Sequence, residues 1–326
     1  MKLIVITGPT GVGKTELCLQ LAEHYGTEII NADSRQIYKE IPIGTAAPTA
    51  EQQQRVRHHF VGNHHIGDYY SASLYEQDVL ALLESYGKDN SDNAEGDKCN
   101  SKDVMILTGG SMMYIDAVCN GIDDIPTVDD ETRQTMKRRL EEEGLPTLLE
   151  ELRQLDPKHY EEVDRNNPRR VIHALEICHI TGKPYSLLRT GRKKERSFDI
   201  IKIGLTRDTI LKVKRGQVIM DHSALYERIN ARVLQMIDEG LEEEARRMLP
   251  YRGEVALNTI GYKELFKYFD GEIDREEAIR QIQSDSREYA RKQLTWFKRD
   301  KGMTWFHPDN ITEIMAFIDE SLNRRI

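Results

Sequence analysis

The chain has 326 residues, which is long enough for one large or two modest domains with buried cores. It carries 46 Lys and Arg residues against 55 Asp and Glu residues, a formal net charge of −9. This acidic balance argues against a protein that coats nucleic acid through bulk positive charge, although it does not exclude a locally basic groove.

The chain opens on the pattern of a strand, a glycine-rich loop and a helix. Residues 3–7 are apolar and mostly β-branched, and residues 17–22 have an apolar helix face. Between them, the motif G-x-x-x-x-G-K-[ST] is matched in full by Gly8, Pro9, Thr10, Gly11, Val12, Gly13, Lys14 and Thr15. In this context the motif predicts a P-loop, whose backbone N–H groups and helix N-terminus bind phosphate oxygens. Lys14 would add a positive charge and Thr15 a hydroxyl for a phosphate or for Mg²⁺. The alternative is a glycine-rich turn with a chance lysine.

A second predicted strand, residues 28–32, ends at Asp33-Ser34-Arg35-Gln36. Ligands of parallel α/β sheets bind outside the carboxyl ends of the strands, so we expect Asp33 to lie beside the P-loop and to face its ligand. Asp is also a favoured N-cap residue, so Asp33 could cap a helix. The two roles are compatible, and we favour the functional one.

The next stretch is irregular and rich in histidine, with His58, His59, His64 and His65 close together. A metal site is one interpretation, but no Cys or second carboxylate accompanies them at ligand spacing, so we favour a polar loop near the site. Residues 71–86 have helical periodicity. Residues 87–102 are polar and charged without an apolar anchor, which predicts a disordered loop or a local insertion.

Residues 104–108 form another predicted buried strand, which ends in Gly109-Gly110-Ser111 before a helix. This turn either repeats the anion-binding geometry of the P-loop or is a tight turn that needs small residues for packing. From residue 123 to about residue 196 the chain is charged and helix-rich, without a clear strand. We therefore expect an α/β catalytic core over residues 1–122 and 198–326, interrupted by an all-helical domain over residues 123–197.

The core resumes with a predicted strand at residues 200–205 and a helix at residues 225–241. Arg228 and Arg232 lie one turn apart on the same face of that helix. A long helix over residues 275–299 is basic on one face. Together with the arginines and lysines of residues 189–196, it predicts a basic surface for a phosphate backbone; ordinary solvated surface is the alternative.

Cysteine usage and apolar patterning bear on where the protein works. The four cysteines are scattered without a C-x-x-C pair, which is typical of reduced thiols. The first residues lead directly into a strand, so no signal peptide fits, and no apolar run reaches the roughly 18 residues of a membrane span. We expect a cytoplasmic protein without membrane contact.

Several segments, taken together and in chain order, resemble one family. The two most specific are Asp-Ser-Arg-Gln-Ile-Tyr at residues 33–38 and Arg-Lys-Gln-Leu-Thr-Trp-Phe at residues 291–297. The others are residues 8–15, 43–46, 109–114, 167–176, 225–233 and 260–263. On these residues, the chain resembles the tRNA dimethylallyltransferases, also called tRNA isopentenyltransferases, over nearly its whole length.

The resemblance implies a P-loop NTPase or kinase-like core with a parallel sheet, plus an all-helical insertion that contacts tRNA. The substrates would be dimethylallyl pyrophosphate and the N6 amine of the adenosine 3′ of the anticodon, flipped out of its stack. The P-loop would then hold a leaving group, whose charge Lys14, Thr15 with Mg²⁺ and Arg232 would stabilise. Asp33 would be the general base, or the acceptor that orients the amine. We expect a monomer.

The family pattern also implies a set of tRNA contacts. They are Asp33, Ser34, Arg35, Gln36, Ser111, Arg133, Arg169, Arg170, Val171, Ile172, His173, Asn258, Thr259, Ile260, Gly261, Tyr262 and Lys263. The chain departs from the family pattern at residues 87–102 and 209–222, which are longer than the corresponding family segments.

Two other functions fit parts of the sequence. A small-molecule or nucleotide kinase would explain the P-loop and the α/β pattern, but not the basic helical insertion or the matches at the tRNA contacts. An RNA-binding protein with a vestigial nucleotide fold would explain the basic surface, but not the intact Lys14, Thr15 and Asp33.

Overall fold

The computed structural model describes residues 1–91, 104–214 and 217–324. The chain forms two units, one made of Met1–Cys119 with Arg196–Ile326 and the other of Asn120–Glu195. The sequence placed these divisions at residues 122/123 and 197/198, two or three residues further along. Each unit is described by itself.

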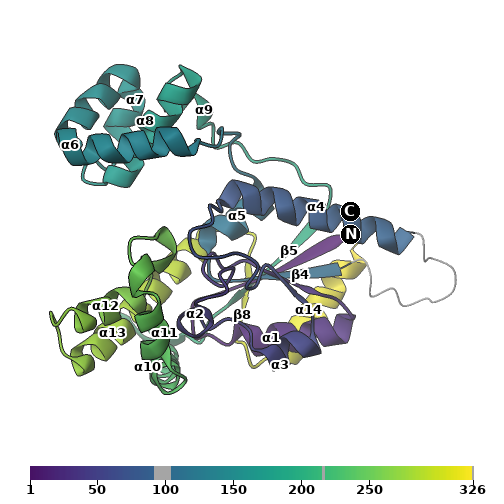
Figure 1. Ribbon diagram of the computed structural model, residues 1–326. Helices are drawn as coiled ribbons and strands as arrows, with labels where there is room; N and C mark the ends of the chain where they lie inside the picture. The colour runs from purple at the N-terminus through teal and green to yellow at the C-terminus, as the bar shows by residue number, and fades with distance from the viewer. Residues whose placement is uncertain (92–103, 215–216, 325–326) are drawn as a thin grey trace. The chain divides into compact units, whose positions relative to one another are not determined.

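The first unit is built on a six-stranded sheet in the order β3-β2-β4-β1-β5-β8, in which every neighbouring pair is parallel (Figure 1). The strands are β1 (Lys2–Thr7), β2 (Ile29–Asn31), β3 (His58–His59), β4 (Val104–Thr108), β5 (Asp199–Leu205) and β8 (Thr304–Phe306). The predicted α/β class with a parallel sheet is confirmed. The P-loop strand β1 lies between β4 and β5, so its carboxyl end is at the middle of the sheet.

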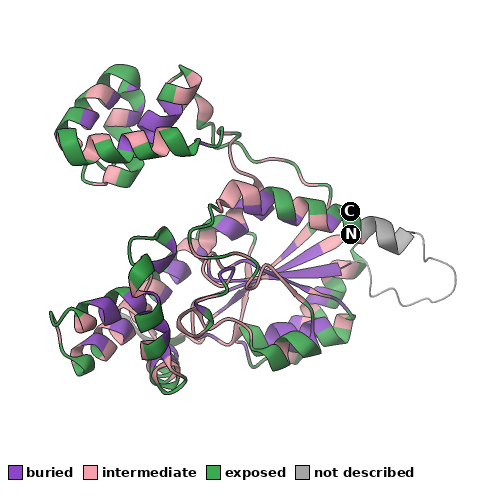
Figure 2. Ribbon diagram, viewed as in Figure 1, coloured by how far each residue is buried: buried purple, intermediate pink, exposed green. Residues whose placement is uncertain are grey.

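Helices cover both faces of the sheet, which is why its central strands are apolar almost without interruption. Leu3 and Val5 of β1 pack with α4 (Ala72–Ser91) and α5 (Met112–Asn120). Ile4 and Ile6 point the other way, toward α1 (Lys14–Tyr25) and α14 (Ile311–Asn323). Figure 2 shows the central strands as buried between these layers.

A helical group continues the first unit beside the sheet. It contains α10 (Ser223–Asp238), α11 (Leu241–Arg247), α12 (Tyr262–Phe269) and α13 (Arg275–Phe297), with the 3₁₀ turns η2 (Leu249–Tyr251) and η3 (Val255–Leu257). These helices share an apolar core with Ile37, Tyr38 and Ile41 from the segment after β2. The group therefore places the arginine-bearing helix α10 next to the carboxyl ends of the strands.

Residues 209–222, where the sequence departs from the family pattern, are largely an antiparallel pair of strands. The strands are β6 (Thr209–Lys214) and β7 (Gln217–Asp221). The predicted disordered segment, residues 87–102, is corrected in part because α4 continues to Ser91, and residues 92–103 lie outside the described residues.

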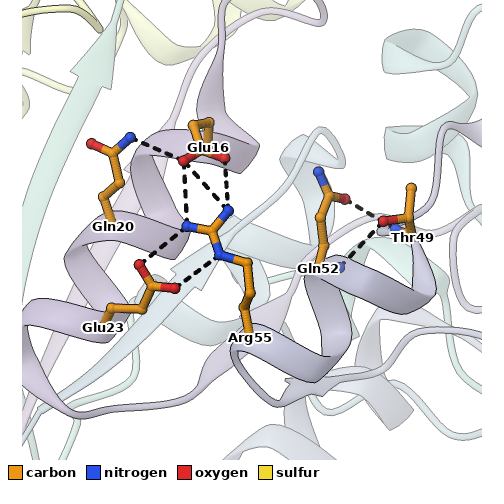
Figure 3. Close-up of polar contacts among 6 residues, drawn as sticks. All are labelled: Glu16, Gln20, Glu23, Thr49, Gln52 and Arg55. Atoms are coloured by element: carbon orange, nitrogen blue, oxygen red, sulfur yellow. Dashed lines mark hydrogen bonds and ion pairs between the residues drawn. The ribbon is translucent and has the colours of Figure 1, made fainter.

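Two short helices, α2 (Pro42–Thr45) and α3 (Ala50–Arg55), follow β2. Thr49 caps α3, accepting a hydrogen bond from the backbone of Gln52, whose side chain accepts in return from the Thr49 N–H (Figure 3). At its other end, Arg55 binds Glu16 and Glu23 of α1 at 3.2 and 2.9 Å. These contacts fasten the segment to the helix that begins at the P-loop, although exposed ion pairs stabilise only weakly.

The second unit consists of α6 (Asp130–Leu155), α7 (Pro157–Glu162), α8 (Pro168–Thr181) and α9 (Tyr185–Leu188). Within α6 the backbone leaves the helical region at Gly144 (φ 81°, ψ 161°), so the element is two helices joined by a kink. The core of the second unit contains Met136, Leu148, Leu152 and Val171. Among the helices that the structure describes, none is long and apolar enough to cross a membrane.

Candidate functional site

The P-loop lines a cavity through Thr10, Gly11, Gly13, Lys14 and Thr15. Helix α1 begins at Lys14, and its N-cap, Gly13, has a φ of 113° and offers no side chain to the first N–H groups. An uncapped helix N-terminus of this kind attracts anions. Gly8 is required because a Cβ there would lie 2.8 Å from the carbonyl oxygen of Leu205.

Basic side chains donate hydrogen bonds to the carbonyl oxygens of the loop. The Lys14 Nζ donates to Gly8 and Pro9 at 2.8 and 2.9 Å, Arg228 Nε to Gly11 at 3.0 Å, and Arg207 Nε to Val12 at 2.8 Å. A fourth basic side chain, Arg232, donates to the Thr10 hydroxyl at 3.3 Å. The loop is thus held in shape by charges that lie close to any bound phosphate.

The cavity has a volume of about 1060 Å³ and lies within the first unit. Its wall brings together the sequence-predicted residues Lys14, Thr15, Asp33, Ser34, Arg35, Gln36, Ser111, Arg232, Asn258, Thr259, Ile260, Gly261 and Lys263. A volume of this size holds a substrate larger than a phosphate group. The cavity therefore joins a phosphate-binding end to a wall made of three separate segments.

Asp33 follows β2 and uses its two oxygens differently. Its Oδ1 accepts a hydrogen bond from the backbone N–H of Arg35 at 2.9 Å, which stabilises the turn after the strand. No hydrogen bond to Oδ2 occurs within the described ranges. The Ser111 hydroxyl holds the same turn, accepting from the Ser34 N–H at 2.8 Å. The next helix begins only at Pro42, so the N-cap alternative for Asp33 is wrong. Asp33 holds a turn instead, and this turn is compatible with a functional role for Oδ2.

Gln293 also lines this cavity, although its position in the sequence does not by itself indicate a role in the site. It is fully buried on α13, and its Oε1 accepts from the Thr10 N–H at 2.8 Å, while its Nε2 donates to the Gly110 carbonyl at 2.9 Å. It therefore ties the P-loop to the turn after β4, against which Asp33 lies. The signal was present: Gln293 is a polar residue between Ala290 and Leu294 in the buried stripe of its helix.

Charges in the cavity affect one another. Burial and the neighbouring Arg232 guanidinium lower the pKa of Lys14 to about 8, and Asp33 opposes this shift. Burial also lowers the pKa of Arg232, again opposed by Asp33. Two cations thus face the phosphate end of the cavity, and one carboxylate lies near enough to stabilise both.

Pyrophosphate affinity is expected to fall as the pH rises through about 8, where Lys14 loses its proton in the free protein. Only the ammonium form attracts phosphate, so the Kd should rise about tenfold per pH unit above this value. Calorimetric titration with inorganic pyrophosphate from pH 6.5 to 9.5 measures this. The Lys14→Arg variant is the control, because its charge persists and any change that remains belongs to the pyrophosphate itself. Parallel pH profiles in the two proteins would contradict the prediction.

The remaining sequence-predicted residues differ in exposure. Tyr262 is fully buried, so its side chain lies in the core rather than on the cavity wall. In the second unit, Arg169, Arg170 and His173 are exposed on α8, Arg133 and Ile172 are half-buried, and Val171 is buried. Arg169 and Arg170 therefore give α8 an exposed positive charge, whereas Val171 packs in the core of the unit.

The histidines after α3 have other partners than a metal. His59 contacts Glu28 at 2.5 Å, His65 contacts Glu40 at 2.6 Å, and the His58 Nδ1 lies 2.8 Å from the Val56 carbonyl. No group of three His, Cys, Asp or Glu side chains suited to a metal occurs in the part of the chain that the structure describes. The Thr15 hydroxyl lines the cavity and is an oxygen of the kind that a divalent cation at a phosphate site takes, together with several oxygens from the phosphates.

Comparisons with known proteins agree on one family. The family model described as IPP transferase matches residues 36–300. The chain is 58% identical to "tRNA dimethylallyltransferase 1" of Phocaeicola vulgatus, over 97% of each chain. It is also similar to the solved tRNA isopentenylpyrophosphate transferase of Bacillus halodurans, with 33% identity, a TM-score of 0.65 and coverage of 98% of this chain and 96% of that one. A eukaryotic dimethylallyltransferase acting on tRNA, 24% identical, shares the fold with a TM-score of 0.76, over 100% of this chain and 80% of that one.

Proposed function

Since this chain belongs to the IPP transferase family of tRNA dimethylallyltransferases, we propose that it transfers the dimethylallyl group of dimethylallyl pyrophosphate to tRNA. The acceptor is the N6 amine of the adenosine 3′ of the anticodon. One observation carries the proposal: a single cavity holds the P-loop, Arg232 and the carboxylate of Asp33. A leaving pyrophosphate and an attacking amine need these groups in one site.

The P-loop end acts on the leaving group. As the bond between the allylic carbon and the pyrophosphate oxygen breaks, negative charge develops on that oxygen. The N–H groups of the loop, the ammonium of Lys14 and the guanidinium of Arg232 stabilise this charge. The loop that presents them is held in shape by the hydrogen bonds that Lys14 and Arg228 donate to its carbonyl oxygens. The pyrophosphate departs with the electron pair of the broken bond.

Asp33 acts on the amine. The N6 nitrogen forms the new bond to the allylic carbon and then carries a proton that must leave, and Asp33 Oδ2 either takes that proton or orients the amine by accepting its hydrogen bond. An adenine amine is a weak nucleophile, so holding it in line with the carbon supplies a large part of the rate. Asp33 is fixed in position because its Oδ1 holds the turn by accepting from the Arg35 N–H.

Mg²⁺ is the proposed cofactor, and the Thr15 hydroxyl would hold it together with pyrophosphate oxygens. When bound, the ion neutralises charge on the pyrophosphate. The protein's own part is to present Thr15 and the uncapped N-terminus of α1 to the same phosphates.

The tRNA would be bound by both units. The cavity segments 33–36, 111 and 258–263 would receive the flipped adenosine. The proposed helical insertion domain, residues 123–197, would contact the phosphate backbone through residues such as Arg169 and Arg170, which are exposed. One chain supplies the P-loop, Asp33 and Arg232, so we infer that the enzyme works as a monomer. Its proposed place of action is the cytoplasm, together with its tRNA substrate.

The test is to incubate the protein with dimethylallyl pyrophosphate, Mg²⁺ and unmodified tRNA, and to look for prenylated adenosine by mass spectrometry of the digested nucleosides. The matched control is the same tRNA with guanosine at the acceptor position, which should give no product. A second arm offers ATP and small acceptors, because a kinase is the alternative. ATP turnover without prenylated adenosine would refute the proposal.

A further inference from the structure

A buried carboxylate outside the catalytic set joins two walls of the cavity. Glu244 on α11 is 1% exposed. Its Oε2 accepts from the Ile43 N–H at 3.0 Å, and its Oε1 accepts from the Gly44 N–H at 2.8 Å and from the Tyr262 hydroxyl at 2.6 Å. No ion pair of Glu244 with Lys or Arg exists in the described part of the chain. A buried carboxylate is costly unless hydrogen bonds replace its hydration, and here three donors converge on it.

The donors come from segments that are far apart in sequence. Ile43 and Gly44 lie in the first turn of α2, where helical N–H groups have no partner within their own helix. Tyr262 begins α12, directly after the cavity-lining residues 258–261. Gly44 permits the contact, because a Cβ there would overlap the Tyr262 ring. Glu244 thus holds the segment after β2 against the segment before α12.

The same network reaches the catalytic turn. The Gln36 Nε2 donates to the carbonyl oxygens of Thr45 and Ala46 at 3.0 and 3.1 Å, at the far end of α2. Gln36 belongs to the turn that begins with Asp33. A continuous path therefore runs from Glu244 through α2 to the turn that carries Asp33. None of its contacts involves residues 8–15, which are fixed instead by Gln293, Arg228 and Arg207.

We propose that Glu244 is a positioning residue for the acceptor nucleotide: it sets the separation of the two cavity walls between which the adenosine is held. The inference rests on the proposed function, because it assigns these walls to the tRNA side of the reaction. Loss of Glu244 lets α2 and the 258–261 segment shift relative to Asp33. The pyrophosphate end keeps its own supports and stays in place.

The experiment compares Glu244→Gln with Tyr262→Phe and with Glu76→Gln. Glu244→Gln keeps the shape but replaces one acceptor oxygen by a donor, so we expect kcat/KM for tRNA to fall about 10- to 100-fold, since small misplacements have effects of this size. The Kd for inorganic pyrophosphate should stay within about twofold. Tyr262→Phe removes one hydrogen-bond donor and leaves the Gly44 N–H on the carboxylate. We therefore expect a smaller loss of kcat/KM for tRNA, again with the Kd for pyrophosphate nearly unchanged.

Glu76→Gln is the control for the loss of a buried carboxylate. Glu76 is 4% exposed, binds Arg196 at 2.7 Å and does not line the cavity. Glu76→Gln should lower the Tm without a selective fall in kcat/KM for tRNA. The proposal is overturned if Glu244→Gln behaves like Glu76→Gln, or if it weakens pyrophosphate binding as much as tRNA turnover. If Glu244→Gln fails to fold, an unchanged kcat/KM for Tyr262→Phe overturns it. A wild-type protein that prenylates no tRNA would refute the proposed function instead.

Discussion

Replacing Asp33 by Asn is expected to lower kcat for tRNA prenylation by about 10²- to 10⁴-fold, the usual contribution of a general base. The amide still accepts the hydrogen bond from the Arg35 N–H, so the turn survives, but Oδ2 is no longer a proton acceptor. Pyrophosphate binding should be kept or become tighter, because the variant removes a negative charge that lies near Lys14 and Arg232. Single-turnover rates with saturating substrates, alongside the Kd for pyrophosphate, measure both effects.

The matched control is Asp68→Asn. Asp68 also holds a turn, accepting from the His65 N–H at 2.7 Å, but it is exposed and outside the cavity wall. The prenylation rate of Asp68→Asn should stay within about twofold of the wild-type rate, as is usual for surface substitutions. If Asp33→Asn retained the wild-type rate and lost only affinity for tRNA, Asp33 would be a binding residue without a role in proton removal. A loss of about tenfold would favour orientation of the amine alone.

Local pattern was enough to predict the strands and the loop of the phosphate end. The motif of residues 8–15, the apolar run before it and Asp33 at the next strand end all depend on neighbours in sequence, and the sheet brings their strand ends to one edge. The segment 209–222 was not predicted as a hairpin, because an isolated pair of strands is stabilised by little apolar burial and leaves a weak pattern.

Gln293 and Glu244 were missed for a different reason. Each is a polar side chain whose partners lie far away in sequence: Gln293 meets Thr10, 283 residues distant, and Glu244 meets Ile43, 201 residues distant. A helix pattern shows that such a residue sits at a buried position, but not what it binds. Tyr262 is the converse case, because a residue predicted to contact tRNA by resemblance has its side chain in the core, bound to Glu244.

Replacing Arg232 by Gln is expected to lower kcat/KM for dimethylallyl pyrophosphate by about 10²- to 10³-fold, because a fixed cation no longer faces the charge that develops on the leaving group. The same change has a second signature. Arg232 lowers the pKa of Lys14, so its loss should raise that pKa above about 8 and move the alkaline limb of pyrophosphate binding to higher pH. Lys14 then stays protonated over a wider pH range, while the affinity for pyrophosphate is lower than in the wild type.

Arg228→Gln is the control one turn away on α10. Arg228 is exposed and supports the Gly11 carbonyl at 3.0 Å, but Arg232 is the arginine whose charge acts on the Lys14 pKa. We therefore expect a smaller loss of activity for Arg228→Gln and an alkaline limb at the wild-type pH. An unmoved limb in Arg232→Gln would mean that the two cations do not face one phosphate site. A shift of the alkaline limb of pyrophosphate binding in Arg232→Gln, but not in Arg228→Gln, would assign Arg232 and Lys14 to the same leaving group.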